Sequence, residues 1–404
     1  MNCLWLARAM PYPLTSGDRI YSAKLAASLA NAGAEVVFVG LSANGVPKSV
    51  PGIVWDAVPG RQRSQTTAVL SPLPLVAAMN ATRTYRSHAA ALVGSQQWDA
   101  IMIDHYGSGW LHPIVMSATN RPVRVFISHN HEASVTRGQW RDTSQSMLVR
   151  AYMWQNWLKT IRLERAVARN SDLITTITDV DAERFAWDVQ NVPMMPLTPG
   201  YDGVRLPSRS ITFDTPRSII LFGSYLWSAK QSSLILFLDQ ADPVMGRAGI
   251  TIDVVGDMDK RLRRSLSTKY RAARFHGYVD DAAPYLARAR MAVIAEPIGG
   301  GFKLKLLEYI FNRVPVASLA VCTHGLSEHV RTHMLLADDV PSLVAKVVAE
   351  VDRVDRLNAR HEGAYNAAIS LFDWSHRGRA LLNAIREIRS GRHRNLKLEW
   401  PHQT

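Results

Sequence analysis

The sequence predicts an α/β protein with two doubly wound, Rossmann-like domains that face each other across a cleft. Short apolar segments alternate with helical patterns along the whole chain, which is typical of parallel sheets covered by helices on both faces. The chain has 404 residues, of which 47% are hydrophobic, and this is enough for two cores. A segment rich in proline and glycine, 191–203, separates two alternating series and suits a linker.

The first series predicts a domain over residues 1–195. Between its first two strands we expect an amphipathic helix over 18–32, with Ile20, Leu25 and Leu29 facing inward and Gly33 ending the helix. Strand, helix and strand then form one βαβ unit. The strands of this domain are expected near 2–8, 35–41, 100–104, 123–128 and 173–177.

The second series predicts a domain over residues 196–372. Its strands are expected near 218–222, 250–255, 275–277, 291–295 and 315–319. Ligands of such sheets bind beyond the carboxyl ends of the strands. The loops that follow these strands are therefore the places to look for a functional site.

Charge and cysteine content restrict the partners. The formal net charge of +13 favours an anionic partner, which can be a small molecule, a membrane surface or nucleic acid. The basic clusters are dispersed and resemble no nucleic-acid-binding motif, so we expect no nucleic acid. Cys3 and Cys322 are too few for a disulfide framework or a zinc site, and the N-terminus does not look secretory. We expect a cytoplasmic protein.

Residues 137–169 depart from the alternation and predict a long helix or a helix pair. Tryptophans and other apolar residues are interleaved with arginines and Lys159 there. Such a stripe can lie on an anionic bilayer. Packing of the tryptophans on the domain's own sheet is the alternative, and it is the commoner use of an amphipathic helix.

The stretch from Glu296 to Glu308 carries the strongest functional signal, because a glycine run opens into a helix with two lysines and a carboxylate. Glycines let backbone approach an anion, and free amides at a helix start attract phosphate. The candidate diphosphate-binding residues here are Gly300, Gly301, Phe302, Lys303 and Lys305. Glu308 can accept hydrogen bonds from ribose hydroxyls. The alternative is a solvated Lys/Glu pair on a surface helix.

Two loops of the first half carry further candidates. Gly17 lies in a second glycine turn before a helix, where it can approach a diphosphate, although Ser16-Gly-Asp18 can also be a plain helix cap. Ser128-His-Asn-His-Glu132 ends a strand, and His129 can donate a hydrogen bond to a sugar hydroxyl or orient a nucleophile. A metal site and a capping role are the alternatives there. Asp104-His105 ends the preceding strand and is expected to line the same cleft.

Two loops of the second half add to the predicted nucleotide site. Lys230 follows a strand and can reach the diphosphate, and the turn formed by Gly277, Tyr278 and Val279 can pair with a base edge. The sequence contains no Gly-x-x-x-x-Gly-Lys-Ser/Thr loop and no Gly-x-Gly-x-x-Gly fingerprint. ATPase and dehydrogenase functions are therefore disfavoured.

In this order, these motifs resemble those of bacterial group 1 glycosyltransferases of the GT-B fold, the family 4-like retaining enzymes. The resemblance rests on Pro11-Tyr-Pro-Leu-Thr-Ser-Gly-Asp-Arg19, Ser128-His-Asn-His-Glu132, Thr198-Pro-Gly-Tyr-Asp-Gly203, Gly223-Ser-Tyr-Leu-Trp227, His276-Gly-Tyr-Val-Asp280 and Gly299-Gly-Gly-Phe-Lys-Leu-Lys-Leu-Leu-Glu308. Phe372-Asp-Trp374 is similar to the family's late tryptophan, which implies that 373–404 form a helix crossing back to the first domain, and a tail.

The resemblance implies a nucleotide-sugar donor in the second domain and an acceptor in the first. By motif position Glu308 holds the ribose, Lys305 and Lys230 hold the diphosphate, Gly17 stands near the donor phosphates, and His129 faces the sugar. Two positions depart from the family pattern. Many relatives carry two glutamates more closely spaced than Glu296 and Glu308, so Glu296 matches the sugar-contacting catalytic position only approximately. Lys230, within Ser228-Ala-Lys-Gln231, is shifted from the expected basic residue.

The resemblance thus implies a hexosyltransferase that uses a nucleotide sugar, retains anomeric configuration and needs no metal or further cofactor, although the residues alone do not distinguish a retaining from an inverting enzyme. The acceptor is expected to be a glycan, a polysaccharide or a lipid-linked glycan of the cell envelope, with peripheral attachment to the inner membrane as an option. A sugar-nucleotide epimerase of the same architecture and a non-catalytic glycan-binding relative are the alternatives. The donor sugar, its base, the linkage and the oligomeric state are not specified, because loop side chains determine specificity.

Overall fold

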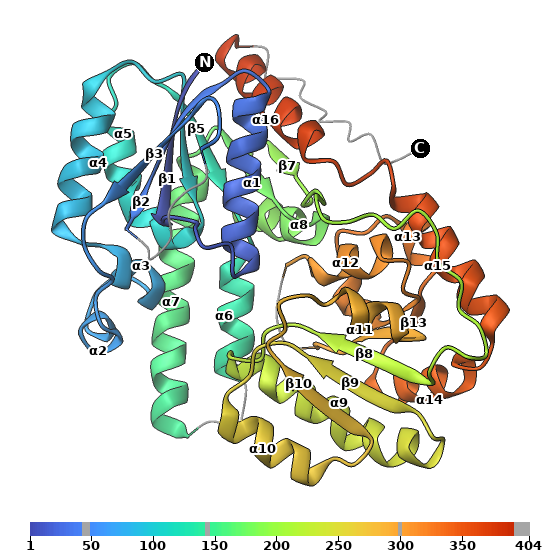
Figure 1. Cartoon of the computed structure of the whole chain (residues 1–404). Coiled ribbons are helices and arrows are strands. Elements are labelled where there is room, and N and C mark those ends of the chain that lie inside the picture. Colours follow the sequence, from blue (N-terminus) through green and yellow to red (C-terminus); the bar gives the residue numbers. More distant parts are fainter. Residues whose placement is uncertain (43–48, 142–145, 298–300, 392–404) are drawn as a thin grey trace. The chain divides into compact units, whose positions relative to one another are not determined.

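The fold was analysed in a computed structural model that describes residues 1–42, 49–141, 146–297 and 301–391. The chain divides into two compact units. Unit 1 consists of Met1–Gly200 and the chain from Asp373 onward, and unit 2 of Tyr201–Phe372. Each unit contains one parallel sheet with helices on both faces (Figure 1), which confirms the predicted α/β class.

The sheet of unit 1 has the strand order β3-β2-β1-β4-β5-β6-β7, and all neighbours are parallel. Its central strands are buried along their length, as their continuous apolar sequences predict. β3 and β7 were not predicted from the sequence. β3 lies at the sheet edge, and all of its residues except Val58 are exposed or half-buried, whereas β7 has only three residues within the proline-rich segment. The strands are β1 (Asn2–Ala9), β2 (Glu35–Leu41), β3 (Ile53–Val58), β4 (Ala100–Asp104), β5 (Val123–Ile127), β6 (Leu173–Thr176) and β7 (Met194–Pro196).

The first helix, α1 (Gly17–Asn31), closely matches the predicted one. Leu25 and Leu29 are buried, Ile20 is only half-buried, and Gly33 adopts a φ of +102° just past the helix end. The other helices of this part of unit 1 are α2 (Gln65–Val69), α3 (Leu75–Asn80), α4 (Arg83–Ser95), η1 (Tyr106–Leu111) and α5 (His112–Met116).

Helix α16 (Trp374–Arg389) returns the chain to unit 1 and packs side by side with α1 (Figure 1). The backbones approach closely because Gly378 lies against Ser28. A Cβ at Gly378 would be 2.0 Å from the Ser28 carbonyl oxygen, and the Gly378 amide donates to Ser28 Oγ at 2.8 Å. Leu381, Leu382 and Ile385 are buried on the inner face of α16.

The described parts of 137–169 belong almost entirely to two helices, α6 (Glu132–Arg141) and α7 (Met147–Arg169). The buried residues of α7 lie in its C-terminal half, from Thr160 to Ala168. Trp140 and Trp157 contact each other, with ring centroids 5.8 Å apart. These two tryptophans therefore pack between the paired helices. Helix α8 (Asp179–Asp188) completes the unit.

The sheet of unit 2 has the order β10-β9-β8-β11-β12-β13 and is also parallel throughout. The sequence predicted five of its strands and missed β13, which has three residues. The strands are β8 (Ser218–Phe222), β9 (Thr251–Val255), β10 (Ala273–Gly277), β11 (Met291–Ile294), β12 (Val316–Leu319) and β13 (Leu335–Ala337). The helices are α9 (Ser228–Arg247), α10 (Lys260–Lys269), α11 (Ala283–Arg288), α12 (Lys305–Phe311), η2 (Ala320–Thr323), α13 (Glu328–Arg331), α14 (Val340–Glu350) and α15 (Val354–Ala368).

Both sheets reverse their strand order once. The reversal lies between β1 and β4 in unit 1 and between β8 and β11 in unit 2. At such a switch point the loops leave neighbouring strands in opposite directions and open a crevice beyond their carboxyl ends. Each unit therefore has one place where its fold favours a ligand.

Candidate active site

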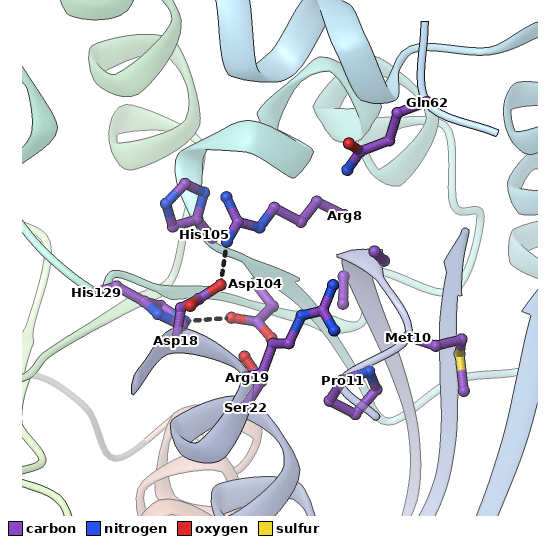
Figure 2. A pocket seen from close by; sticks show the side chains of 12 residues that line it. Arg8, Met10, Pro11, Asp18, Arg19, Ser22, Gln62, Asp104, His105 and His129 are labelled. Carbon is purple, nitrogen blue, oxygen red and sulfur yellow. Dashed lines mark hydrogen bonds and ion pairs between the residues drawn. The ribbon is translucent and has the colours of Figure 1, made fainter. Parts of the chain in front are cut away.

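A cavity of about 250 Å³ lies at the switch point of unit 1 (Figure 2). Its walls come mainly from the end of β1 and the residues after it, the first turns of α1, the last residue of β4 with the residue after it, and His129 after β5. The lining residues are Ala7, Arg8, Ala9, Met10, Pro11, Asp18, Arg19, Ser22, Gln62, Asp104, His105 and His129.

His129 and Asp104 form a buried pair in the wall of this cavity. His129 Nε2 lies 2.7 Å from Asp104 Oδ1, and Trp5 Nε1 donates to the other carboxylate oxygen at 2.8 Å. Burial alone would raise the pKa of Asp104, but the His129 imidazole and hydrogen bonds from His129, Ser22 and Trp5 outweigh it, and the pKa is lowered. Asp104 is therefore ionised at neutral pH and requires the proton of His129 on Nε2.

With its proton on Nε2, His129 has only Nδ1 available for a hydrogen bond to a ligand. Nδ1 of His129 has no hydrogen-bond partner among the described residues. While the ring is neutral, Nδ1 carries a lone pair and accepts a hydrogen bond, for example from a sugar hydroxyl. The sequence suggested donation by His129, and the geometry assigns donation to Nδ1 only when the ring is protonated.

Arg8 lies in the cavity wall near Asp18 and His105. Its guanidinium pairs with Asp18 (Figure 2). Burial opposes ionisation of Asp18, but Arg8 and a hydrogen bond from Ser16 outweigh it and lower the pKa. The Asp18 side chain thus serves this ion pair, whereas the Ser16 side chain makes no capping hydrogen bond to α1. Sequence reasoning missed Arg8 as a site residue, because it lies in an apolar strand and its partner is ten residues away.

His105 lines the same cavity as His129, and the two rings are 5.3 Å apart. It adopts a φ of +66°, its Nδ1 accepts from the Gly107 amide at 3.0 Å, and its Nε2 lies 3.6 Å from Glu132 Oε1. Burial and the nearby Arg8 lower the pKa of His105 more than Glu132 raises it. His105 is consequently neutral at neutral pH.

His131 faces away from this cavity. Its ring contacts Ser134 Oγ at 2.7 Å and Asp188 Oδ2 at 3.0 Å. Within the described ranges, no group of three or more His, Cys, Asp or Glu residues is arranged to hold a metal ion. Gly17 is exposed as the first residue of α1 and does not line the cavity, so its proposed approach to a phosphate stays a prediction.

The switch point of unit 2 holds the lysines that the glycine-rich stretch predicted. Glu296 follows β11, and its carboxylate pairs with Lys305 Nζ through one oxygen and lies 3.6 Å from Lys303 Nζ through the other. Lys230 near the start of α9 interacts electrostatically with the same three groups. Burial would raise the pKa of Glu296, but Lys305, Lys303 and Lys230 lower it to about 2. A small cavity of about 10 Å³ lies here.

The stretch itself differs from the expected glycine turn and long helix. Gly300 lies outside the described residues, Gly301 adopts a φ of +72°, and Phe302 is half-buried with its ring centroid 6.0 Å from that of Phe372. Helix α12 starts only at Lys305 and has seven residues, so its dipole is small. The lysine side chains carry most of the positive charge at this point.

Glu308 lies on α12 and has partners other than the lysines. Tyr201 donates its hydroxyl to Oε2 at 3.1 Å, and Asn312 donates to Oε1 at 2.9 Å. Burial raises the pKa of Glu308 more than these hydrogen bonds lower it. Since Lys305 pairs with Glu296 instead, the alternative of a simple Lys305/Glu308 surface pair does not describe this helix.

Two glycines form a close backbone contact next to Lys305, and no pattern in the sequence indicates this contact. Gly223 follows β8, and a Cβ there would lie 3.1 Å from Lys305 Nζ. Gly256 follows β9 with a φ of +134°, and a Cβ there would lie 1.7 Å from the Gly223 carbonyl oxygen. Beside them, Gly277 accepts a hydrogen bond from the Gly256 amide at 2.8 Å, and the next side chain, Tyr278, is 72% exposed. Val279 is half-buried against the core.

Two family models match the chain. The glycosyl transferase 4-like domain matches residues 16–200, and the glycosyl transferases group 1 model matches residues 216–352. The first match begins after β1 and includes α1 and β4 beside the switch point of unit 1, and the second includes the switch point of unit 2. A search of curated proteins finds no match.

Solved structures match nearly the whole chain at low identity. HepE of Anabaena in complex with UDP and glucose gives a TM-score of 0.63 at 13% identity, covering 96% of this chain and 100% of the other. WaaG, a glycosyltransferase involved in lipopolysaccharide biosynthesis, gives 0.64 at 16% identity, covering 95% and 99%. The trehalose 6-phosphate synthase of Burkholderia multivorans gives 0.64 at 11% identity, covering 96% and 97%.

The two Rossmann-like units and these neighbours define a GT-B protein. Because the family models match both units, the chain belongs to the group 1 glycosyltransferases. The resemblance noted in the sequence is confirmed.

Proposed function

We propose that the protein transfers a hexose from a nucleotide-sugar donor to a glycan, a polysaccharide or a lipid-linked acceptor. The observation that carries this proposal is the cluster of Lys230, Lys303 and Lys305 at the switch point of unit 2. Transfer leaves negative charge on the departing diphosphate, and fixed positive charge at that point lowers the barrier. The lysines supply charge that a metal ion provides in other enzymes, so we propose a metal-independent reaction.

The donor is held through its ribose, diphosphate and base by residues of unit 2. Glu308 accepts from the ribose hydroxyls, Lys305, Lys303 and Lys230 bind the diphosphate, and the exposed Tyr278 ring with its flanking backbone contacts the base. Structures of HepE were solved with UDP and with UDP-glucose, which supports a donor of this class.

The acceptor is placed in unit 1, where the cavity exposes polar groups for a sugar. His129 Nδ1 accepts from a hydroxyl of a sugar bound in this cavity. In unit 2, Glu296 is the candidate for contact with the donor's sugar. Membership in group 1 supports retention of anomeric configuration. An epimerase would convert the free nucleotide sugar without acceptor, and a glycan-binding relative would release no nucleoside diphosphate from any mixture.

We also propose a cytoplasmic enzyme of cell-envelope polysaccharide synthesis that attaches to an anionic membrane surface. In the described parts of the chain, no helix is long and apolar enough to cross a membrane. The N-terminal half of α7 exposes Met147, Leu148 and Trp154, with exposed fractions of 85%, 86% and 49%. The same helix carries Arg150 and Arg162, and this combination suits an anionic bilayer surface.

Calorimetry of a Glu308→Ala variant tests the donor site. We expect the affinity for UDP to fall about tenfold, because a charged acceptor of ribose hydroxyls is lost. The variant should unfold at close to the wild-type temperature, since Glu308 is half-buried and its partners Tyr201 and Asn312 are polar. Unchanged UDP affinity would refute the ribose assignment.

A further inference from the structure

Glu296 has a contact pattern that sugar binding alone does not explain. Both of its carboxylate oxygens are directed to lysines, Oε1 to Lys305 Nζ and Oε2 to Lys303 Nζ. The carboxylate is buried, and Lys230 faces it as a third cation. A carboxylate and a phosphate present similar anionic oxygens to an ammonium group. Glu296 thus has the contacts that one phosphate of a bound diphosphate would make.

The space around the cluster agrees with this interpretation. The cavity bounded by Lys230, Glu296 and Lys305 measures about 10 Å³, room for about one water molecule. A diphosphate cannot enter this cavity while the Glu296 carboxylate holds the lysines. To bind, it has to replace Glu296 as the partner of Lys305.

From these contacts we infer that Glu296 is an internal counter-anion of the diphosphate site, and that it tunes the site toward the nucleotide sugar over the nucleoside diphosphate that is released. This inference rests on the proposed donor site. It assigns Glu296 a role in binding and product release that is separate from contact with the sugar.

The charge balance gives the direction of the preference. Three ammonium groups and one carboxylate leave two net positive charges in the cluster. Each phosphate of a nucleotide sugar is a diester-like group with one negative charge, so the donor neutralises the cluster. After transfer the terminal phosphate becomes a monoester, with a charge of about −1.5 to −2 at neutral pH. The product then exceeds the charge of the cluster, and repulsion from Glu296 favours its release.

Removal of the Glu296 charge should therefore strengthen binding rather than weaken it. In a Glu296→Gln variant we expect affinity for UDP to rise about tenfold, and affinity for UDP-glucose to rise less, because the extra positive charge interacts most with the more anionic ligand. Inorganic pyrophosphate, which needs no base contact, should bind more tightly as well. The enhancement should shrink at high salt.

Isothermal titration of the full chain with UDP, UDP-glucose and pyrophosphate at two ionic strengths measures these changes. Glu328→Gln is the matched control, because it removes one negative charge from an exposed side chain of unit 2 that pairs with Arg331. It should leave all three affinities unchanged. Glu296→Asp keeps the charge and should retain the wild-type ratio of UDP to UDP-glucose affinity, and thermal unfolding checks that both Glu296 variants are folded.

The outcomes separate this inference from the proposed function. Wild-type binding of UDP or pyrophosphate, with a Glu296→Gln variant that binds no more tightly, would overturn the counter-anion role alone. Equal gains for UDP and UDP-glucose would overturn the preference for the donor. If neither the wild type nor Glu296→Gln binds any of the three probes, the diphosphate site itself is refuted.

Discussion

The switch points of the two units differ in how ready they are for a ligand. In unit 1 a cavity of about 250 Å³ remains open, whereas the corresponding cavity in unit 2 measures about 10 Å³. The walls of the first include His129 and Asp104, which buried hydrogen bonds fix at the ends of strands. The walls of the second include Lys230 and Lys305 among mostly apolar residues, and Lys305 pairs with Glu296.

The two sites therefore have different requirements for ligand binding. Unit 1 holds its polar groups in place before a ligand arrives, so little ordering is needed there. In unit 2 a diphosphate would have to replace the ion pair between Lys305 and Glu296, so its affinity would be a difference between two sets of ionic contacts. In the cavity of unit 1, substitutions should therefore act through the hydrogen bonds that hold the side chains in place, and at the lysine cluster of unit 2 through the balance of charge.

The largest effect is expected at the close contact between Gly256 and Gly223, next to Lys305. Gly256→Val should destabilise unit 2 by about 3–5 kcal/mol, because a Cβ would overlap the Gly223 carbonyl oxygen and φ is +134°. Urea denaturation followed by tryptophan fluorescence measures the change. Gly94→Ala in α4 is the control, since no atom lies within 4 Å of its Cβ position, and it should be neutral or slightly stabilising.

Loss of the central cation is the next largest effect. Lys305→Ala should lower kcat/KM by about 10²–10³, as measured for the loss of one group that stabilises transition-state charge. Steady-state release of nucleoside diphosphate measures it. If Lys305→Ala retained wild-type turnover, charge would not dominate the site of unit 2, and the contrast between the units would disappear.

In unit 1 a smaller effect is expected from a substitution that keeps shape and removes charge. Asp104→Asn should lower kcat about ten- to a hundredfold, because a neutral amide no longer requires the proton of His129 on Nε2. UDP affinity should not change, because Asp104 belongs to the other unit. A reduced UDP affinity with an unchanged kcat would contradict the assignment of Asp104 to a positioning role.

The pH dependence of stability should differ between the two sites. His105 has a lowered pKa in the folded state, so the unfolded state binds its proton first and stability falls as pH decreases below about 6.5. Glu296 has a pKa lowered to about 2, so its contribution is constant above its unfolded pKa of about 4.5 and is lost only below that value. His131 and His361 also have lowered pKa values, so they add to the decrease in stability below about pH 6.5.

Denaturation between pH 7 and pH 5 can separate these groups. His105→Gln should flatten the decrease in stability, and Glu296→Gln should leave its slope unchanged. The groups that face His105 are Arg8, Glu132 and His129, and all three remain in the first variant. An unchanged slope in His105→Gln would show that other histidines account for the acid sensitivity.

The smallest effect is expected on the surface of α7. Leu148→Ser combined with Trp154→Ser should reduce binding to vesicles containing anionic lipid about tenfold, because two exposed apolar side chains are lost. Co-sedimentation measures it, with neutral vesicles as reference. Trp187→Ser, an equally polar change at a 90% exposed tryptophan of α8, should have no effect. Equal losses in both variants would refute a specific role for α7.

The sequence predicted the central strands of both sheets because buried parallel strands are continuous apolar runs. It missed β3, β7 and β13, which are short or partly exposed edge strands with a weaker pattern. The positions of Lys303, Lys305 and Glu308 near the switch point of unit 2 were predictable because their signal is local, and their role in donor binding stays a prediction. The site was not predictable where the partners are distant in sequence, because no local pattern shows that Asp104 holds His129 or that Gly256 touches Gly223.

The return of α16 to unit 1 has a consequence for synthesis of the chain. Unit 2 is the continuous segment Tyr201–Phe372, so the ribosome synthesises all of it before it synthesises α16, which covers α1. During this interval the face of α1 that α16 later covers is exposed to solvent, and exposed apolar surface makes a nascent chain prone to aggregation. A protein truncated after Gly200 lacks α16, so this face of α1 would stay exposed.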